Sequence, residues 1–152
     1  MHSQDQIFAQ NASRLVLKRA SEPVSESWNK KYGRQCLRLP ALILQCGLCQ
    51  TVAFYESKAQ DGSEENSNQS RRYFSALLND LAEALGFTLL THGDPPQTDS
   101  PRSQLIEKAR MAGLTEYQKL NRDALQCANY FKRYAEAILK VQLGEDTDTE
   151  SA

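Results

Sequence analysis

Four cysteines are the residues of this 152-residue chain whose type and spacing could most directly do chemistry. Cys46 and Cys49 form a Cys-x-x-Cys motif, and Cys36 and Cys127 stand apart from it. A zinc site usually needs a second close pair of ligands. A redox motif of this kind normally follows a β-strand, and no strand is predicted here. We therefore predict no metal and no cofactor and interpret Cys36 and Cys127 as core residues, with a zinc or redox protein as an alternative.

The other reactive side chains do not gather into a catalytic pattern. His2 is terminal and His92 lies among Gly and Pro residues, so neither has a partner at a spacing suited to acid–base chemistry. The 7 glycines are dispersed along the chain and form no phosphate-binding loop. We expect a protein that is not an enzyme and has no small-molecule substrate.

Basic side chains form a more informative pattern. Lys30, Arg34 and Arg38 are four residues apart, so they share one face of a helix, and Arg14 and Lys18 repeat this spacing. A third set falls on the side of the last predicted helix that points away from the core: Lys119, Arg122, Lys132, Arg133 and Lys140. Rows with few acids among them can bind phosphates without reading bases. The alternative is an ordinary solvated helix face.

The overall charge of the chain hides these basic segments. The net charge is −1, yet residues 1–58 hold 8 basic against 4 acidic side chains, and residues 101–142 again hold 8 against 4. Residues 59–100, with 2 against 7, and residues 143–152, with 0 against 4, cancel this excess. A nucleic-acid partner is therefore compatible with the near-neutral total.

The elements that must carry these residues all show helical periodicity. Apolar residues recur every three or four positions, and no stretch alternates with period two for long. We predict an all-α fold, a compact single-domain bundle of about six or seven helices. The helices are expected over 3–19, 24–39, 41–46, 48–58, 73–85, 101–112 and 115–143.

Local signals place several boundaries of these helices. Ser3 with Gln6 and Thr115 with Gln118 have the spacing of capping boxes. Pro40 is expected either to kink a helix or to restart one, because it lacks an N–H and fixes φ.

The connecting segments are polar. Residues 59–70 are expected to form a mobile loop and residues 91–99 a second loop. The helical domain then spans residues 1–143, followed by a disordered acidic tail over 144–152. The longest apolar runs are about six residues, against roughly 20 for a membrane span. No signal peptide is visible at the start, so we expect a cytoplasmic protein with no membrane partner.

Aromatic residues lie on the apolar stripes of the predicted core. Tyr32, Tyr73 and Phe74 occupy such stripes, and a neighbouring helix is expected to bury either Tyr55 or Phe54. Buried rings cannot stack on bases, so sequence-specific reading of RNA is not expected.

The segment from Leu39 to Phe54 (LPALILQCGLCQTVAF) resembles the signature of the small helical subunit of the type III-B CRISPR Cmr effector complex. In that family a Leu-Pro-Ala start leads to a Gly-Leu-x-Gln turn and an apolar helix. The pattern from Glu116 to Ala137 is similar to the C-terminal helix of the family. Length, helical pattern and polar loop also agree, so the likeness covers most of the chain.

This resemblance implies a non-catalytic subunit that acts in antiviral defence. Several copies would stack into an inner filament beside other Cmr subunits, with basic faces along the CRISPR RNA and target RNA backbone, and other subunits would cut the target. Cys46 and Cys49 depart from the family pattern, in which other residues are common at these positions, so the turn does not depend on thiols. The alternative is a purely protein-binding helical scaffold without RNA contact.

Two sets of residues follow from this interpretation. Pro40, Gly47, Leu48 and Gln50 form a structural motif at a helix junction, in which Gly47 supplies a positive φ. Leu48 is expected to pack back across the turn, and Gln50 to satisfy free backbone groups. The candidate RNA-binding residues rest on helical periodicity alone: Arg14, Lys18, Lys30, Arg34, Arg38, Lys119, Arg122, Arg133 and Lys140.

Overall fold

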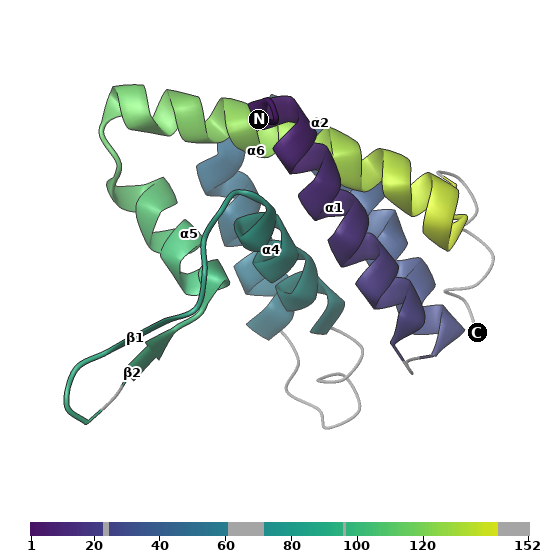
Figure 1. Ribbon diagram of the computed structural model, residues 1–152, viewed down its shortest axis with the longest axis horizontal. Helices are drawn as coiled ribbons and strands as arrows, with labels where there is room; N and C mark the ends of the chain where they lie inside the picture. Colours follow the sequence, from purple (N-terminus) through teal and green to yellow (C-terminus); the bar gives the residue numbers. More distant parts are fainter. Residues whose placement is uncertain (23–24, 61–71, 96, 143–152) are drawn as a thin grey trace.

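Figure 1 shows the computed structural model of the protein, which describes residues 1–22, 25–60, 72–95 and 97–142. These residues form five α-helices: α1 (Gln4–Ser21), α2 (Glu26–Gln60), α4 (Arg72–Ala84), α5 (Pro101–Met111) and α6 (Leu114–Tyr134). A π-helical turn, η1 (Ala135–Leu139), continues α6. Two short strands, β1 (Leu90–His92) and β2 (Gln97–Asp99), lie between α4 and α5.

The largely helical class is confirmed, but the predicted number of six or seven helices is wrong. Within the described residues, the predicted segments 24–39, 41–46 and 48–58 fall in one element, α2, which begins at Glu26. Pro40 lies inside α2, and the helix continues through it. The predicted loop 59–70 lies outside the described residues except for Ala59 and Gln60, which end α2. The predicted tail 144–152 also lies outside them.

Helix α2 bends at Gly47, which has φ of 81° and ψ of 163°. This region of backbone space is essentially restricted to glycine. We call residues 26–46 the first leg of α2 and residues 48–60 the second leg. In Figure 1 the two legs lie behind the other helices, the first on the right and the second on the left, and diverge from a bend behind α6.

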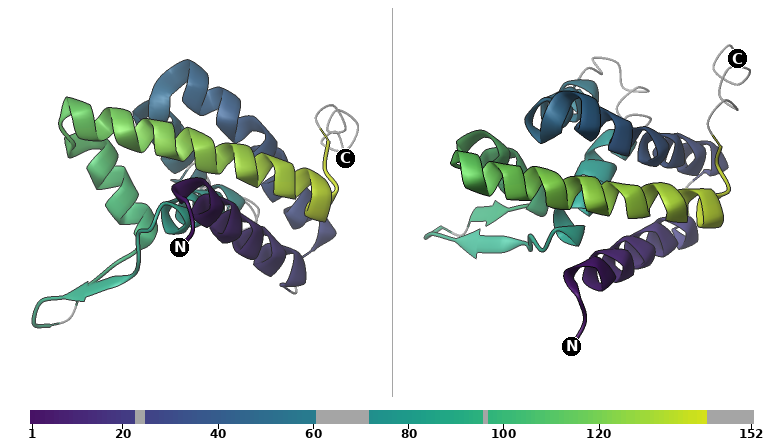
Figure 2. Two further views of the ribbon diagram at one scale, coloured as in Figure 1. Left: turned by 45° about the horizontal axis from the view of Figure 1, so that its top comes forward. Right: turned by 90° about the horizontal axis from the view of Figure 1, so that it is seen from above.

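The core lies where α1, α4 and α6 meet the two legs of α2. Figures 1 and 2 show α6 running across both α1 and α2, and α4 packs against α2 as well. Each helix contributes its apolar side, and the largest fully buried side chains include Phe8, Leu15, Tyr32, Ile43, Leu77, Leu81 and Phe131. A series of ring contacts joins both legs of α2 to the start of α4: Tyr32 with Trp28, Trp28 with Tyr73, Tyr73 with Phe74, and Phe74 with Tyr55.

A β-hairpin between α4 and α5 projects from the bundle (Figure 1). The two strands pair antiparallel with Thr91 opposite Thr98, and Gly93 adopts a φ of 84° in the turn. The predicted loop 91–99 is therefore an exposed connection, but part of it is β-structure. Each strand has three residues, which is too short for a period-two pattern to be recognised.

The predicted ends of the first and last helices agree with the structure only in part. The capping box of α1 is confirmed, since Ser3 and Gln6 exchange backbone-to-side-chain hydrogen bonds of 2.8 and 3.2 Å. The second capping box is wrong, because Gly113 is the N-cap of α6 and Thr115 already lies inside the first turn. The last helix also ends earlier than predicted, at Lys140, which has a positive φ of 55°.

By length and composition, α2 is the one helix of the described residues that could cross a membrane. The core helix of a globular protein passes the same test. Here the two legs diverge at Gly47 and pack against α4, α6 and η1, which is the arrangement of a core helix.

Candidate nucleic-acid interface

The first basic row does not form the predicted surface. Lys30 and Arg38 are exposed on the first leg of α2, but Arg34 between them is buried, with 8% of its surface accessible. Lys30 also lies 3.9 Å from Glu26, in a loose ion pair between two exposed side chains. The prediction that Lys30, Arg34 and Arg38 share one exposed face is therefore wrong.

The reason is that this part of α2 is covered on more than one side. Tyr32 bonds to α4, while Gly33 meets the C-terminal segment, where a Cβ added to Gly33 would lie 2.8 Å from Val141. Every residue from 32 to 37 is buried. Helical spacing shows which side chains share a face, but it does not show what packs on the face opposite the core.

Two other basic sets are exposed as predicted. Arg14 and Lys18 are both exposed on α1. Lys119, Arg122 and Arg133 are exposed along α6, and at the helical rise their Cα atoms span about 21 Å. We call these three residues the α6 basic face. Lys132 is half-buried, and Lys140 is exposed but lies beyond the regular helix, at the end of η1.

The α6 basic face has no acid of its own helix among its cations. Helical geometry places Lys119, Arg122 and Arg133 within an arc of about 60° around α6. Asp123 is the acidic residue between Lys119 and Arg133 in sequence, and it lies about 40° outside that arc. A phosphodiester strand could therefore meet all three cations without meeting a carboxylate from α6.

One carboxylate approaches this helix from α1. Asp5 accepts hydrogen bonds from Tyr130 Oη and Gln126 Nε2, both at 2.6 Å. The Tyr130 bond, followed by the Gln126 bond, lowers the pKa of Asp5. This contact fixes the start of α1 beside α6, and it also places a negative charge inside the arc of the α6 basic face, because Gln126 lies between Lys119 and Arg133 around the helix. Local sequence could not predict this contact, because the partners are 121 and 125 residues apart.

The Gly-Leu-x-Gln turn at residues 47–50 is the junction between the two legs of α2. Side chains of α6 hold this junction in place. The predicted positive φ of Gly47 and the predicted burial of Leu48 are confirmed. The Leu48 N–H donates to Asn121 Oδ1 at 2.7 Å, and the Cys49 N–H donates to Tyr117 Oη at 3.0 Å. Both acceptors are side chains of α6, so the junction sets how α6 lies across α2.

The predicted role of Gln50 is wrong. Gln50 is exposed, and the backbone donors that it was expected to satisfy are bonded to α6 instead. The first N–H groups of a helix lack partners within the helix. Local sequence cannot show that side chains 73 and 68 residues away supply the acceptors. Pro40, the remaining residue of the motif, is buried in the first leg.

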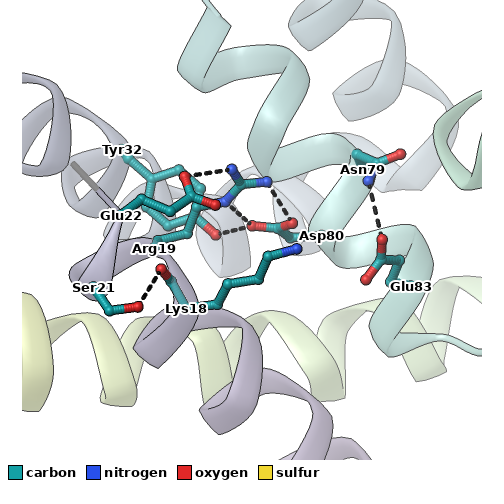
Figure 3. A network of polar contacts seen from close by, with 8 residues as sticks. All are labelled: Lys18, Arg19, Ser21, Glu22, Tyr32, Asn79, Asp80 and Glu83. Atoms are coloured by element: carbon teal, nitrogen blue, oxygen red, sulfur yellow. Dashed lines mark hydrogen bonds and ion pairs between the residues drawn. The ribbon is translucent and has the colours of Figure 1, made fainter. Parts of the chain in front are cut away.

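A buried ion pair that periodicity did not predict joins α1 to α4 (Figure 3). Arg19 donates from Nε and Nη2 to the two carboxylate oxygens of Asp80, each at 2.8 Å, and the Tyr32 hydroxyl donates to the same carboxylate. Burial by itself lowers the pKa of Arg19, but the hydrogen bonds and charge of Asp80 outweigh it and raise that pKa. Arg19 is therefore a structural cation. The burial of Asp80 could have been predicted from the sequence, since helical spacing puts this residue on the apolar stripe of α4.

The cysteines divide as the core interpretation predicts. Cys36 and Cys127 are buried, and burial raises the pKa of both thiols. Cys46 is exposed and Cys49 is half-buried at the junction. Among the residues that the structure describes, no group of three or more His, Cys, Asp or Glu side chains could hold a metal ion.

Together these features define a small helical-bundle protein with exposed basic helix faces. Comparison with known proteins agrees: the family model described as CRISPR-associated protein (Cas_Cmr5) matches residues 4–138. The chain belongs to this family, and the resemblance to the small helical Cmr subunit is confirmed.

A similar sequence and a similar solved structure support this assignment. Over 140 residues the chain is 31% identical to the CRISPR system Cmr subunit Cmr5 of Thermus thermophilus. The match covers 92% of this chain and 99% of that protein. An X-ray crystal structure of a CRISPR-associated Cmr5 family protein from the same organism is similar, with a TM-score of 0.67 and 33% identity. That similarity covers 91% of this chain and 98% of the solved chain.

Proposed function

We propose that this protein is a non-catalytic small subunit of a type III-B CRISPR Cmr complex, acting in antiviral defence in the cytoplasm. In this proposal it stacks with other Cmr subunits and further copies of itself, and it contacts the backbone of the CRISPR RNA and target RNA. Family membership and the name of the Thermus thermophilus relative as a Cmr subunit support the assembly.

The observation that carries the RNA contact is the α6 basic face. Three exposed cations lie on one side of one helix, along about 21 Å, without an interleaved acid of that helix. Cations in this arrangement attract phosphates and release counterions, whatever the base sequence. The junction at Gly47 supports the proposal, because Asn121 and Tyr117 tie α6 to α2 and hold this face rigidly. Arg14 and Lys18 of α1 are the second proposed contact.

The test is the salt dependence of RNA binding by the assembled complex. We compare the wild-type protein with the triple variant Lys119→Gln, Arg122→Gln and Arg133→Gln. Each phosphate contact contributes about 0.7 to 0.9 to the slope of log affinity against log salt. Loss of three contacts should lower that slope by about 2 to 3. An unchanged slope in a folded, assembled variant contradicts the proposal.

The matched control is the double variant Lys108→Gln and Arg110→Gln. Both residues are exposed cations of α5, one and three residues after Glu107, so their loss removes charge from the surface without touching the α6 basic face. The control should leave the slope unchanged. If it lowers the slope as much per charge as the α6 variant does, binding reflects overall charge rather than a defined face.

A second candidate function is a purely protein-binding scaffold without RNA contact. Large apolar side chains at three positions favour it, since Leu44, Met111 and Leu114 are 73%, 76% and 74% exposed. Exposed apolar side chains favour protein contacts where they lie together on a surface, and Met111 and Leu114 both lie at the connection between α5 and α6. Under this alternative the α6 triple variant fails to join the complex, while RNA binding by the complexes that do form keeps its wild-type salt dependence.

A further inference from the structure

A groove of about 720 Å³ lies between the two legs of α2 and the start of α4. Arg38 and Gln45 line it from the first leg, Phe54 and Lys58 from the second leg, and Tyr73 from α4. The groove exists because the legs diverge at the Gly47 bend. Its volume falls within the range of about 300–1,000 Å³ that is usual for small-ligand sites.

The lining of this groove combines positive charge with an accessible aromatic ring. Arg38 and Lys58 are cations, and none of the described residues that line the groove is acidic. Lys58 Nζ lies 5.7 Å from the centre of the Phe54 ring. Phe54 is 40% exposed, whereas its ring neighbours Tyr55 and Phe74 are 1% and 7% exposed. The choice that the sequence left open, Tyr55 or Phe54 in the core, is thus settled in favour of Tyr55.

The Phe54 ring is held in place from behind. It makes edge contacts with Tyr55, at a centroid distance of 5.6 Å, and with Phe74, at 6.4 Å. A ring that is packed on one side and accessible on the other can offer a fixed surface for stacking. The half-buried Tyr73 and the exposed amide of Gln45 line the same groove, and both can donate or accept hydrogen bonds.

We propose that this groove binds one unpaired nucleotide of an RNA strand, with the base against the Phe54 ring and the phosphate between Arg38 and Lys58. The inference rests on the proposed function, because that function supplies RNA as the ligand. Single-strand binding proteins combine cations that follow the backbone with aromatic rings on which bases stack. Such stacking tolerates any base, since every base has a π-face. The groove therefore adds base contact without adding sequence specificity.

The test uses RNA oligonucleotides that carry the fluorescent base 2-aminopurine, whose emission falls when it stacks. The full-length wild-type protein should quench the probe in single-stranded RNA. Phe54→Leu keeps an apolar side chain of similar volume but removes the ring, so it should abolish quenching and weaken binding about fivefold or more. Phe54→Tyr restores a ring and should restore quenching. Thermal melting of each variant checks that it folds.

The matched control for Phe54→Leu is Leu44→Ala, an exposed apolar residue of α2 that does not line the groove. It should leave quenching and affinity unchanged. Duplex RNA has no unpaired base, so its affinity should not depend on Phe54. The α6 triple variant should weaken binding of both single-stranded and duplex RNA.

Each outcome of this experiment decides one of the two proposals. No quenching by the wild-type protein, or full quenching by folded Phe54→Leu, overturns the nucleotide groove and leaves the α6 basic face standing. Loss of quenching in Phe54→Leu, together with wild-type salt dependence in the α6 triple variant, supports the groove and contradicts the backbone contact. If Arg38→Gln with Lys58→Gln leaves RNA affinity unchanged but releases an acidic Cmr subunit, the groove binds protein and the inference is wrong.

Discussion

Replacing Asp80 with asparagine tests whether the buried ion pair holds α1, α2 and α4 together. The variant Asp80→Asn keeps the side-chain size but removes the negative charge that meets two nitrogens of Arg19 and the hydroxyl of Tyr32. The side chain of Asp80 is 2% exposed and that of Arg19 is 17% exposed. Removing one partner of a buried pair typically destabilises a protein by about 3–5 kcal/mol.

The expected loss lies at the lower end of this range, at about 3 kcal/mol. Arg19 retains some contact with water and a 3.4 Å ion pair with Glu22, so its charge is not left wholly uncompensated. Urea unfolding followed by circular dichroism measures the change. For a chain of this length the midpoint of thermal unfolding should fall by about 6–12 °C.

Two further variants make this measurement decisive. Glu83→Gln, in the same helix, alters a half-buried residue whose side chain accepts a hydrogen bond from nearby Asn79, and it should change stability by at most about 0.5 kcal/mol. Combining Asp80→Asn with Arg19→Met should cost less than the sum of the two single changes, because no unpaired charge remains. A loss below about 1 kcal/mol for Asp80→Asn alone would refute the reasoning.

Three other predictions concern the junction and the buried side chains. Gly47→Ala should destabilise the fold by about 2–3 kcal/mol in urea unfolding, because its backbone angles are essentially restricted to glycine; a change within about 0.5 kcal/mol would contradict this. Tyr32 and Tyr55 should keep their protons above pH ~10, where tyrosines of the unfolded chain ionise, since burial raises the pKa of both. The contribution of these buried tyrosines to stability is thus full below pH ~10 and is lost as the pH rises. Ultraviolet absorbance measures tyrosine ionisation, and ionisation of every tyrosine of the native protein near pH 10 would contradict this prediction. Cys36 and Cys127 should react with a thiol reagent only on unfolding, since both are buried, whereas the other two cysteines should react in the native protein; rapid labelling of all four would be inconsistent with this core.

Much of the helical framework could be predicted from local sequence. The start of α1 depends on a capping box between Ser3 and Gln6, which are neighbours in the chain. The bend at Gly47 depends on a residue type that alone adopts its backbone angles easily. The start of α6 could not be predicted in this way, since Gly113 caps it without a side-chain hydrogen bond and Thr115 offered a competing signal.

The candidate site was less predictable, because it depends on which surfaces meet in three dimensions. Periodicity placed Arg34 with Lys30 and Arg38, but the C-terminal segment packs on Gly33 and this stretch of α2 is buried all round. Which of Phe54 and Tyr55 is buried depends on how α4 packs against the second leg, and local sequence does not show this packing. Long-range contacts of this kind cannot be predicted from the spacing of apolar residues.

The central claim, that α6 presents its cations to RNA, is tested most directly by photocrosslinking. The assembled complex is irradiated with a labelled target RNA, and the crosslinked peptides are identified by mass spectrometry. We expect crosslinks to peptides of α6 that contain Lys119, Arg122 or Arg133, and their loss in the triple variant. Crosslinks confined to other subunits, with none to α6 of this protein, would contradict it.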